Sequence, residues 1–112
     1  WGILNVREEF LKEHPDLVKR VLAVYEQARK FSLANYEEEK RVFIAVTKLP
    51  GNVVDKQLKE RTDITQSKIG SPQRESILAA GLALQQAGVI KPDVNVKAVL
   101  DSLIDDSVPL TN

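Results

Sequence analysis

The chain contains no cysteine, which excludes a disulfide, a zinc–thiolate site and a cysteine nucleophile. It also has no excess of charge, since 16 basic residues balance 16 acidic ones. Nucleic-acid binding and binding to anionic membranes both need a basic excess, so the composition argues against these two roles. No apolar run approaches the roughly 20 residues of a membrane span. We therefore expect that this chain of 112 residues does not itself span a membrane.

Motifs for cofactor and metal chemistry are also missing. The sequence has no Gly-rich phosphate loop, no paired-histidine metal motif and no Gly-x-Ser-x-Gly elbow. The acidic run Glu37-Glu38-Glu39 falls in the first turn of a predicted helix, where the helix dipole favours negative charge. Calcium loops need carboxylates at regular spacing around a glycine, and that pattern is absent. We expect no cofactor, no metal and no catalysis.

His14 is the only histidine. A general base needs an orienting partner and a pocket, and no serine or cysteine motif accompanies His14, so we interpret it as structural. His14-Pro15-Asp16 also spells the tripeptide with which J-domain co-chaperones contact an Hsp70 partner. There it lies in an exposed loop after a strongly basic helix, whereas the segment before it here is short and mixed in charge. A stand-alone helical protein-interaction module, such as a J-domain-like co-chaperone, is therefore the alternative function.

What the sequence does have is helical periodicity, with apolar residues recurring at spacings of three and four. Pro15 cannot continue the short helix predicted at 8–13, but it suits the first position of a second helix. The apolar residues of this second helix predict one buried face. They are Leu17, Val18, Val21, Leu22, Val24, Tyr25, Ala28 and Phe31.

The ends of the other helices follow from capping residues. Asn35 and Glu38 form a capping-box pattern at the start of the third helix, which carries Val42, Phe43, Ala45, Val46 and Leu49 and which Pro50-Gly51 ends. The caps predicted for the remaining helices are Asn52, Ser71 (followed by Pro72) and Asn95. Val54 and Leu58 of the fourth helix, which runs to about Arg61, face inward.

Two glycines bear on the fifth helix. Gly88 ends it by adopting the left-handed conformation. Gly81 lies in its middle at a cost of about 1 kcal/mol against alanine. A close crossing with another helix would justify that cost.

These elements predict an all-α fold of five to six helices, with one short N-terminal strand as an option. We expect a single helical domain over residues 1–112. Residues 1–6 read as a strand or an extended lead-in, residues 7–104 hold the helices, residues 62–70 are a loop within them, and residues 105–112 form a tail.

Three blocks of this sequence resemble the C-terminal part of periplasmic solute-binding proteins of ABC importers, in the branch for aliphatic sulfonates, nitrate and taurine. The likeness extends from about Ile3 to Asp106. The blocks are Arg7-x-x-Phe10-x-x-x-His14-Pro15-Asp16-Leu17-Val18-Lys19, then Ala34-Asn35-Tyr36-Glu37-Glu38, and finally Gly88-Val89-Ile90-Lys91 with Asp93-Val94-Asn95-Val96. The 62–70 loop and Gly81 match no pattern of this family, so the branch stays open.

The resemblance implies the C-terminal helical segment of a type II periplasmic-binding-protein α/β fold. It implies a periplasmic or extracytoplasmic protein that captures a small oxyanion, aliphatic sulfonate foremost, and delivers it to an ABC permease in the membrane. The two α/β lobes that close around the solute are not in this chain. No signal peptide is present, since charged residues interrupt the N-terminus at Arg7. The abrupt start at Trp1 is typical of a cut inside a larger protein.

Ligand residues in this family lie mainly upstream of the part seen here. The candidates within this chain are Trp1, whose ring offers area and one donor, and Asn5 on the same extended stretch. For Trp1 we favour a structural interpretation over a ligand role, either packing in a core or the edge of a fragment.

Overall fold

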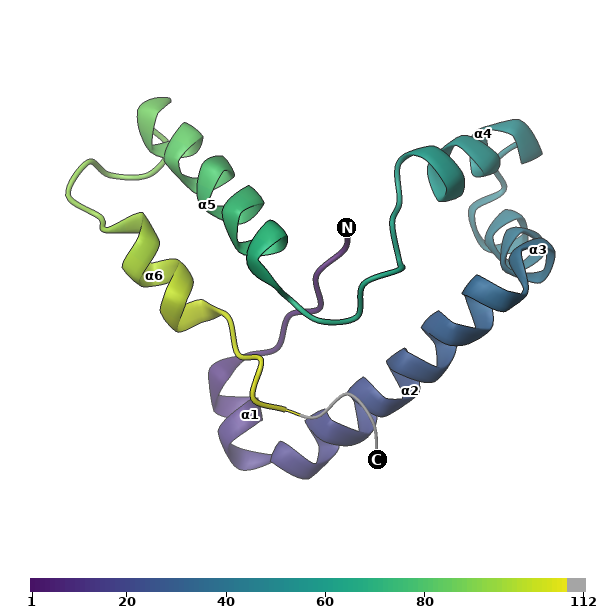
Figure 1. Cartoon of the computed structure of the whole chain (residues 1–112), viewed down its shortest axis with the longest axis horizontal. Coiled ribbons are helices and arrows are strands. Elements are labelled where there is room, and N and C mark those ends of the chain that lie inside the picture. The colour runs from purple at the N-terminus through teal and green to yellow at the C-terminus, as the bar shows by residue number, and fades with distance from the viewer. Residues whose placement is uncertain (109–112) are drawn as a thin grey trace. The chain divides into compact units, whose positions relative to one another are not determined.

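The computed structural model describes residues 1–108, and all regular structure in that part of the chain is helical (Figure 1). The described residues divide into two compact units, 1–67 and 68–108. Each unit is considered by itself below, and the single helical domain stays a prediction. Trp1 to Val6 form an extended lead-in rather than a strand, so the option of an N-terminal strand is wrong. A strand needs a neighbour to pair with, and none of the described segments supplies one.

The first unit consists of consecutive helices that pack in chain order, α1 with α2, α2 with α3, and α3 with α4. α4 continues without a break into a π-helical turn, η1. The bounds are α1 Glu8–Glu13, α2 Pro15–Ala34, α3 Tyr36–Thr47, α4 Gly51–Asp55 and η1 Lys56–Glu60. The predicted start of α2 at Pro15 is confirmed.

Asn35 lies between α2 and α3, but it does not cap α3 with its side chain. Its Nδ2 instead donates to the carbonyl of Phe31 at 3.0 Å, so the side-chain amide is bound to the last turn of α2. Glu38 pairs with Arg41 on the surface of α3. The capping-box prediction for Asn35 and Glu38 is therefore wrong, because both side chains are engaged elsewhere.

The turn between α3 and α4 also differs from the prediction. α3 ends at Thr47, and Lys48 takes the left-handed conformation with φ of 61°. Gly51 begins α4 with Pro50 before it, so Asn52 lies inside the helix and is not its cap. Val54 is fully buried and Leu58 half-buried, as predicted. The described residues of the 62–70 segment form the expected loop.

The second unit is a helical hairpin of α5 (Ser71–Gln86) and α6 (Val96–Leu103). Gly70, and not Ser71, takes the position before α5, and its N–H donates to Oε1 of Gln73 at 2.9 Å. The predicted cap is thus displaced by one residue, while Pro72 lies in the first turn as expected.

Two predictions for the hairpin, at Gly88 and Asn95, are confirmed, and the structure also supplies the reason for Gly81. Gly88 has φ of 82° after the end of α5. Asn95 Oδ1 accepts from the N–H of Ala98 at 3.1 Å and caps α6. A Cβ at Gly81 would lie 2.7 Å from Cγ1 of Val96, closer than carbon atoms approach without displacement. The close helix crossing that would justify Gly81 therefore exists, between α5 and α6.

Burial is sparse in both units. Among the described residues, the buried apolar side chains are Ala23, Val54 and Leu100. Large apolar side chains are exposed in each unit, such as Val24 (63%) and Val46 (77%) in the first and Val99 (54%) and Leu103 (68%) in the second. Each unit therefore leaves apolar helix surface that its own helices do not cover.

The predicted buried face of α2 shows this directly. Val18 and Leu22 are half-buried, but the rest of that face is exposed, which makes the prediction of one buried face wrong. The exposed members are Leu17, Val21, Val24, Tyr25, Ala28 and Phe31. In α3, only Phe43 of the predicted stripe is half-buried. No helix in residues 1–108 is long and apolar enough to cross a membrane.

Candidate functional site

The most organised polar contact of the first unit holds the 62–67 loop against α2. The side chains of Glu26 and Arg29, one helical turn apart, form an ion pair at 2.5 Å and are 10% and 20% exposed. Nη1 of Arg29 also donates to the carbonyl oxygens of Ile64, at 3.1 Å, and Thr65, at 3.5 Å. Arg29 therefore joins two segments 35 residues apart. Its hydrogen bonds hold the pKa of Glu26 below the ordinary value.

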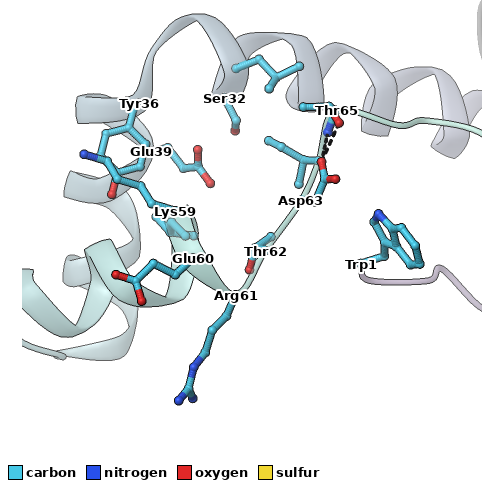
Figure 2. A pocket seen from close by; sticks show the side chains of 13 residues that line it. Trp1, Ser32, Tyr36, Glu39, Lys59, Glu60, Arg61, Thr62, Asp63 and Thr65 are labelled. Atoms are coloured by element: carbon cyan, nitrogen blue, oxygen red, sulfur yellow. Dashed lines mark hydrogen bonds between the residues drawn. The ribbon is translucent and has the colours of Figure 1, made fainter. Parts of the chain in front are cut away.

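Next to this contact, the loop, the end of α2, the start of α3 and η1 enclose an open hollow of about 640 Å³. Figure 2 shows Trp1 and Tyr36 on opposite sides of it, with the loop between them. The hollow is lined by Trp1, Ser32, Leu33, Tyr36, Glu39, Leu58, Lys59, Glu60, Arg61, Thr62, Asp63, Ile64 and Thr65. A smaller hollow of about 220 Å³ lies between α5 and α6 in the second unit.

One wall of the larger hollow is fixed by a short chain of polar contacts. The hydroxyl of Tyr36 donates to Asp55 at 2.6 Å, and Lys40 donates to the other oxygen of the same carboxylate at 3.0 Å. Nζ of Lys59 lies over the ring of Tyr36, 4.4 Å from its centre. Because the Asp55 carboxylate accepts its proton in a hydrogen bond, the pKa of Tyr36 rises to about 12. The pKa of Asp55 is lowered by the hydrogen bonds from Tyr36 and Lys40.

The charges around the hollow do not suit an anion. Among the side chains that line it, three are carboxylates, Glu39, Glu60 and Asp63, and two are cations, Lys59 and Arg61. The ammonium of Lys59 lies over the Tyr36 ring, and the side chain of Arg61 points away from the hollow in Figure 2. Oxyanion sites gather several donors on one point in a water-poor pocket. This open hollow has no such arrangement.

Asp63 has a structural task within the loop. Its Oδ1 accepts hydrogen bonds from the N–H of Thr65, at 2.9 Å, and from the Thr65 hydroxyl, at 2.6 Å (Figure 2). These bonds lower the pKa of Asp63 and close a local turn. In residues 1–108, no group of three or more histidine, cysteine or acidic side chains could hold a metal ion.

The two ligand candidates from the sequence are not brought together. Trp1 lines the hollow and is half-exposed. Asn5 does not line it, and its Nδ2 donates to the carbonyl of Ile3 at 3.2 Å. A ligand role for either residue stays a prediction.

His14 lies outside the hollow at the junction of α1 and α2. Its side chain is 48% exposed, and its ring lies against that of Phe10 with centres 4.9 Å apart. Pro15 and Asp16 already belong to the first turn of α2, so the tripeptide has no loop of its own. Of the acidic run in α3, Glu39 alone faces the hollow.

None of the protein-family models, curated proteins or solved structures compared with this chain matches it. Geometry and the residue pattern therefore carry the functional argument. Sequence reasoning missed Glu26 and Arg29. The available signal was an acid and a base three residues apart on the side of α2 that also carries Leu22. Charged residues on an apolar side of a helix indicate an ion pair or a hydrogen bond to another segment.

Proposed function

We propose that this chain is the C-terminal helical part of an extracytoplasmic solute-binding protein. The whole protein captures a small oxyanion, aliphatic sulfonate foremost and nitrate or taurine otherwise, and delivers it to an ABC-type permease. The chain itself performs no catalysis. The proposed family rests on the resemblance of the three sequence blocks, and one structural observation supports a larger parent.

That observation is the extended lead-in. Its large apolar side chains are all exposed, with exposed fractions of 51% for Trp1, 40% for Ile3, 48% for Leu4 and 48% for Val6. Extended segments rich in such residues are characteristic of strands buried in the sheet of an α/β protein. A parent sheet would cover these side chains and pair the backbone of residues 1–6. This supports a role as the segment that leaves an α/β lobe and enters the helices.

The same proposal predicts that the solute site lies in the lobes and not in this chain. A small oxyanion needs donors converging from two walls and exclusion of water. The hollow beside the 62–67 loop is open, and its lining has more carboxylate side chains than cationic ones. Trp1 and its neighbours are at most the edge of one wall.

Isothermal titration calorimetry tests the proposal with two proteins, this chain and the product of the complete reading frame that encodes it. The longer protein should bind an alkanesulfonate, nitrate or taurine at micromolar concentration or better. This chain should give no saturable heat with the same anions at millimolar concentration. Saturable binding by this chain would contradict the upstream site. A longer protein that binds none of these anions would contradict the transport role.

A further inference from the structure

α2 carries a second apolar face that its own unit does not use. Leu17, Val21, Val24, Ala28 and Phe31 are all exposed and follow one another at spacings of four, three, four and three. We call these five residues the α2 seam. Such spacing places side chains in one narrow stripe along a helix, the pattern by which one helix packs lengthwise on another.

The seam lies opposite the face that the first unit does use. Ala23 and Glu26 are buried and Leu22 and Arg29 are half-buried on that inward face, while half-buried Val18 lies at its edge, next to the seam. A single helix thus has one face committed to its unit and another available to a partner. Covering the seam does not require any rearrangement of the first unit.

We propose that the α2 seam pairs two copies of this chain as antiparallel helices. In an antiparallel pair, a seam residue near the start of one α2 lies opposite a seam residue near the end of the other. Aligning Val21 with Val24 of the second copy also aligns Leu17 with Ala28, so a large side chain meets a small one. The same register places Phe31 beside the start of α2 of the second copy, at each end of the pair. A parallel pair would instead place Ala28 against Ala28 and leave a gap.

The flanking positions are compatible with this register. Tyr25 borders the seam on one side and lies near Val18 of the second copy. On the other side, Arg20 lies near Gln27 of the second copy. Neither contact places like charges together, which would cost pairing energy. The seam therefore offers shape matching without electrostatic repulsion.

The surface available is enough for a weak dimer. The exposed fractions are 41% for Leu17, 51% for Val21, 63% for Val24, 59% for Tyr25 and 52% for Phe31. If pairing covered them completely, these side chains would bury at most roughly 500 Å² on each copy, or about 1,000 Å² in the pair. That is close to the lower limit for a specific interface, so we expect association at micromolar concentrations. The pairing does not depend on the proposed transport role.

The absence of cysteine allows a direct test by disulfide trapping. Leu17→Cys and Ala28→Cys are made as separate variants, one of them tagged, and mixed under mild oxidation. Antiparallel pairing puts these two positions opposite each other. In the same register, two identical cysteines on the two chains lie 11 residues apart along the helices, about 16 Å, which is beyond the reach of a disulfide. The mixture should therefore cross-link at least about tenfold faster than either variant alone.

Sedimentation equilibrium from about 10 to 200 µM gives the second measurement. The unmodified chain should associate to a dimer, and Val24→Glu should remain a monomer with unchanged helical circular dichroism. Val46→Glu is the matched control, because Val46 is 77% exposed on α3 and lies off the seam. It should dimerise like the unmodified chain. A monomeric unmodified chain, equal loss in both variants, or faster trapping within each single-cysteine variant would each overturn the proposal.

Discussion

Replacing Arg29 with alanine should release the 62–67 loop from α2 while leaving the helices folded. Arg29 joins these segments through its hydrogen bonds to the carbonyl oxygens of Ile64 and Thr65. Alanine would remove both bonds and leave Glu26, whose side chain is 10% exposed, without its partner. The hydrogen bonds from Thr65 to Asp63 lie within the loop and do not join it to α2, so Arg29 supplies the polar contact that alanine would remove.

The size of the effect follows from the type of bond. A hydrogen bond to a charged group contributes about 1.5–3 kcal/mol. The 3.5 Å bond to Thr65 is long, so we count the shorter bond to Ile64 as the main contribution. Losing it should raise the population of the open loop by about 10- to 150-fold. The cost of leaving Glu26 unpaired acts in addition on α2.

Limited trypsin digestion measures this opening, because Arg61 and Lys68 flank the loop. When opening is fast, cleavage follows the population of the open form, so Arg29→Ala should be cut at least about tenfold faster. Arg41→Ala is the matched control, since Arg41 forms an exposed pair with Glu38 and does not contact the loop. It should change the rate less than threefold. Equal rates in the two variants would refute the role given to Arg29.

The same contact predicts a dependence on pH. Arg29 lowers the pKa of Glu26 in the folded state below its ordinary 4.5. The stability that this pair contributes is therefore complete above about pH 4.5 and decreases as the pH falls through the lowered pKa. Hydrogen exchange of the loop amides, corrected for intrinsic rates, should accelerate at the acidic end. Glu26→Gln should remove that acid-induced change.

Three further outcomes follow from other contacts. Gly81→Ala should destabilise the α5–α6 crossing although alanine gains about 1 kcal/mol of helix propensity, and adding Val96→Ala should restore much of the loss in amide protection of α5; an additive double-variant cycle would contradict the clash. Asp55→Asn should lower the pKa of Tyr36 from about 12 toward its ordinary 10 in an ultraviolet titration, and an unchanged pKa would show that Asp55 is not the cause. His14→Asn should leave solute binding by the longer protein within a few-fold of normal, whereas a hundredfold loss with intact folding would give His14 a functional role.

The sequence was sufficient to predict most helix positions, because these depend on neighbouring residues. Pro15, Gly88 and Asn95 act on the backbone within one turn, and all three behave as predicted. Asn35 was mispredicted because its side chain could serve the helix before it as well as the helix after it. Composition alone does not decide between two such local partners.

The candidate site was much less predictable. The contact of Arg29 with Ile64 spans 35 residues, and no local pattern indicates which carbonyl a half-buried guanidinium will reach. The hollow likewise combines Trp1, Tyr36 and the 62–67 loop, which are distant in the sequence. Gly81 is intermediate, because its cost in a helix raised the question of a close crossing, and only the structure showed that crossing and identified Val96 as the neighbour.

α2 shows why periodicity predicts a helix better than it predicts burial. Spacings of three and four are produced both by a face that packs inside its own unit and by a seam that packs on another helix. Leu22 belongs to the first kind and Val24 to the second, although they are two residues apart. A hydrophobic pattern records that a face needs a partner, not where that partner comes from. In a unit with so little buried apolar surface, the exposed half of such a pattern is the more informative half, because it specifies the geometry that a partner must match.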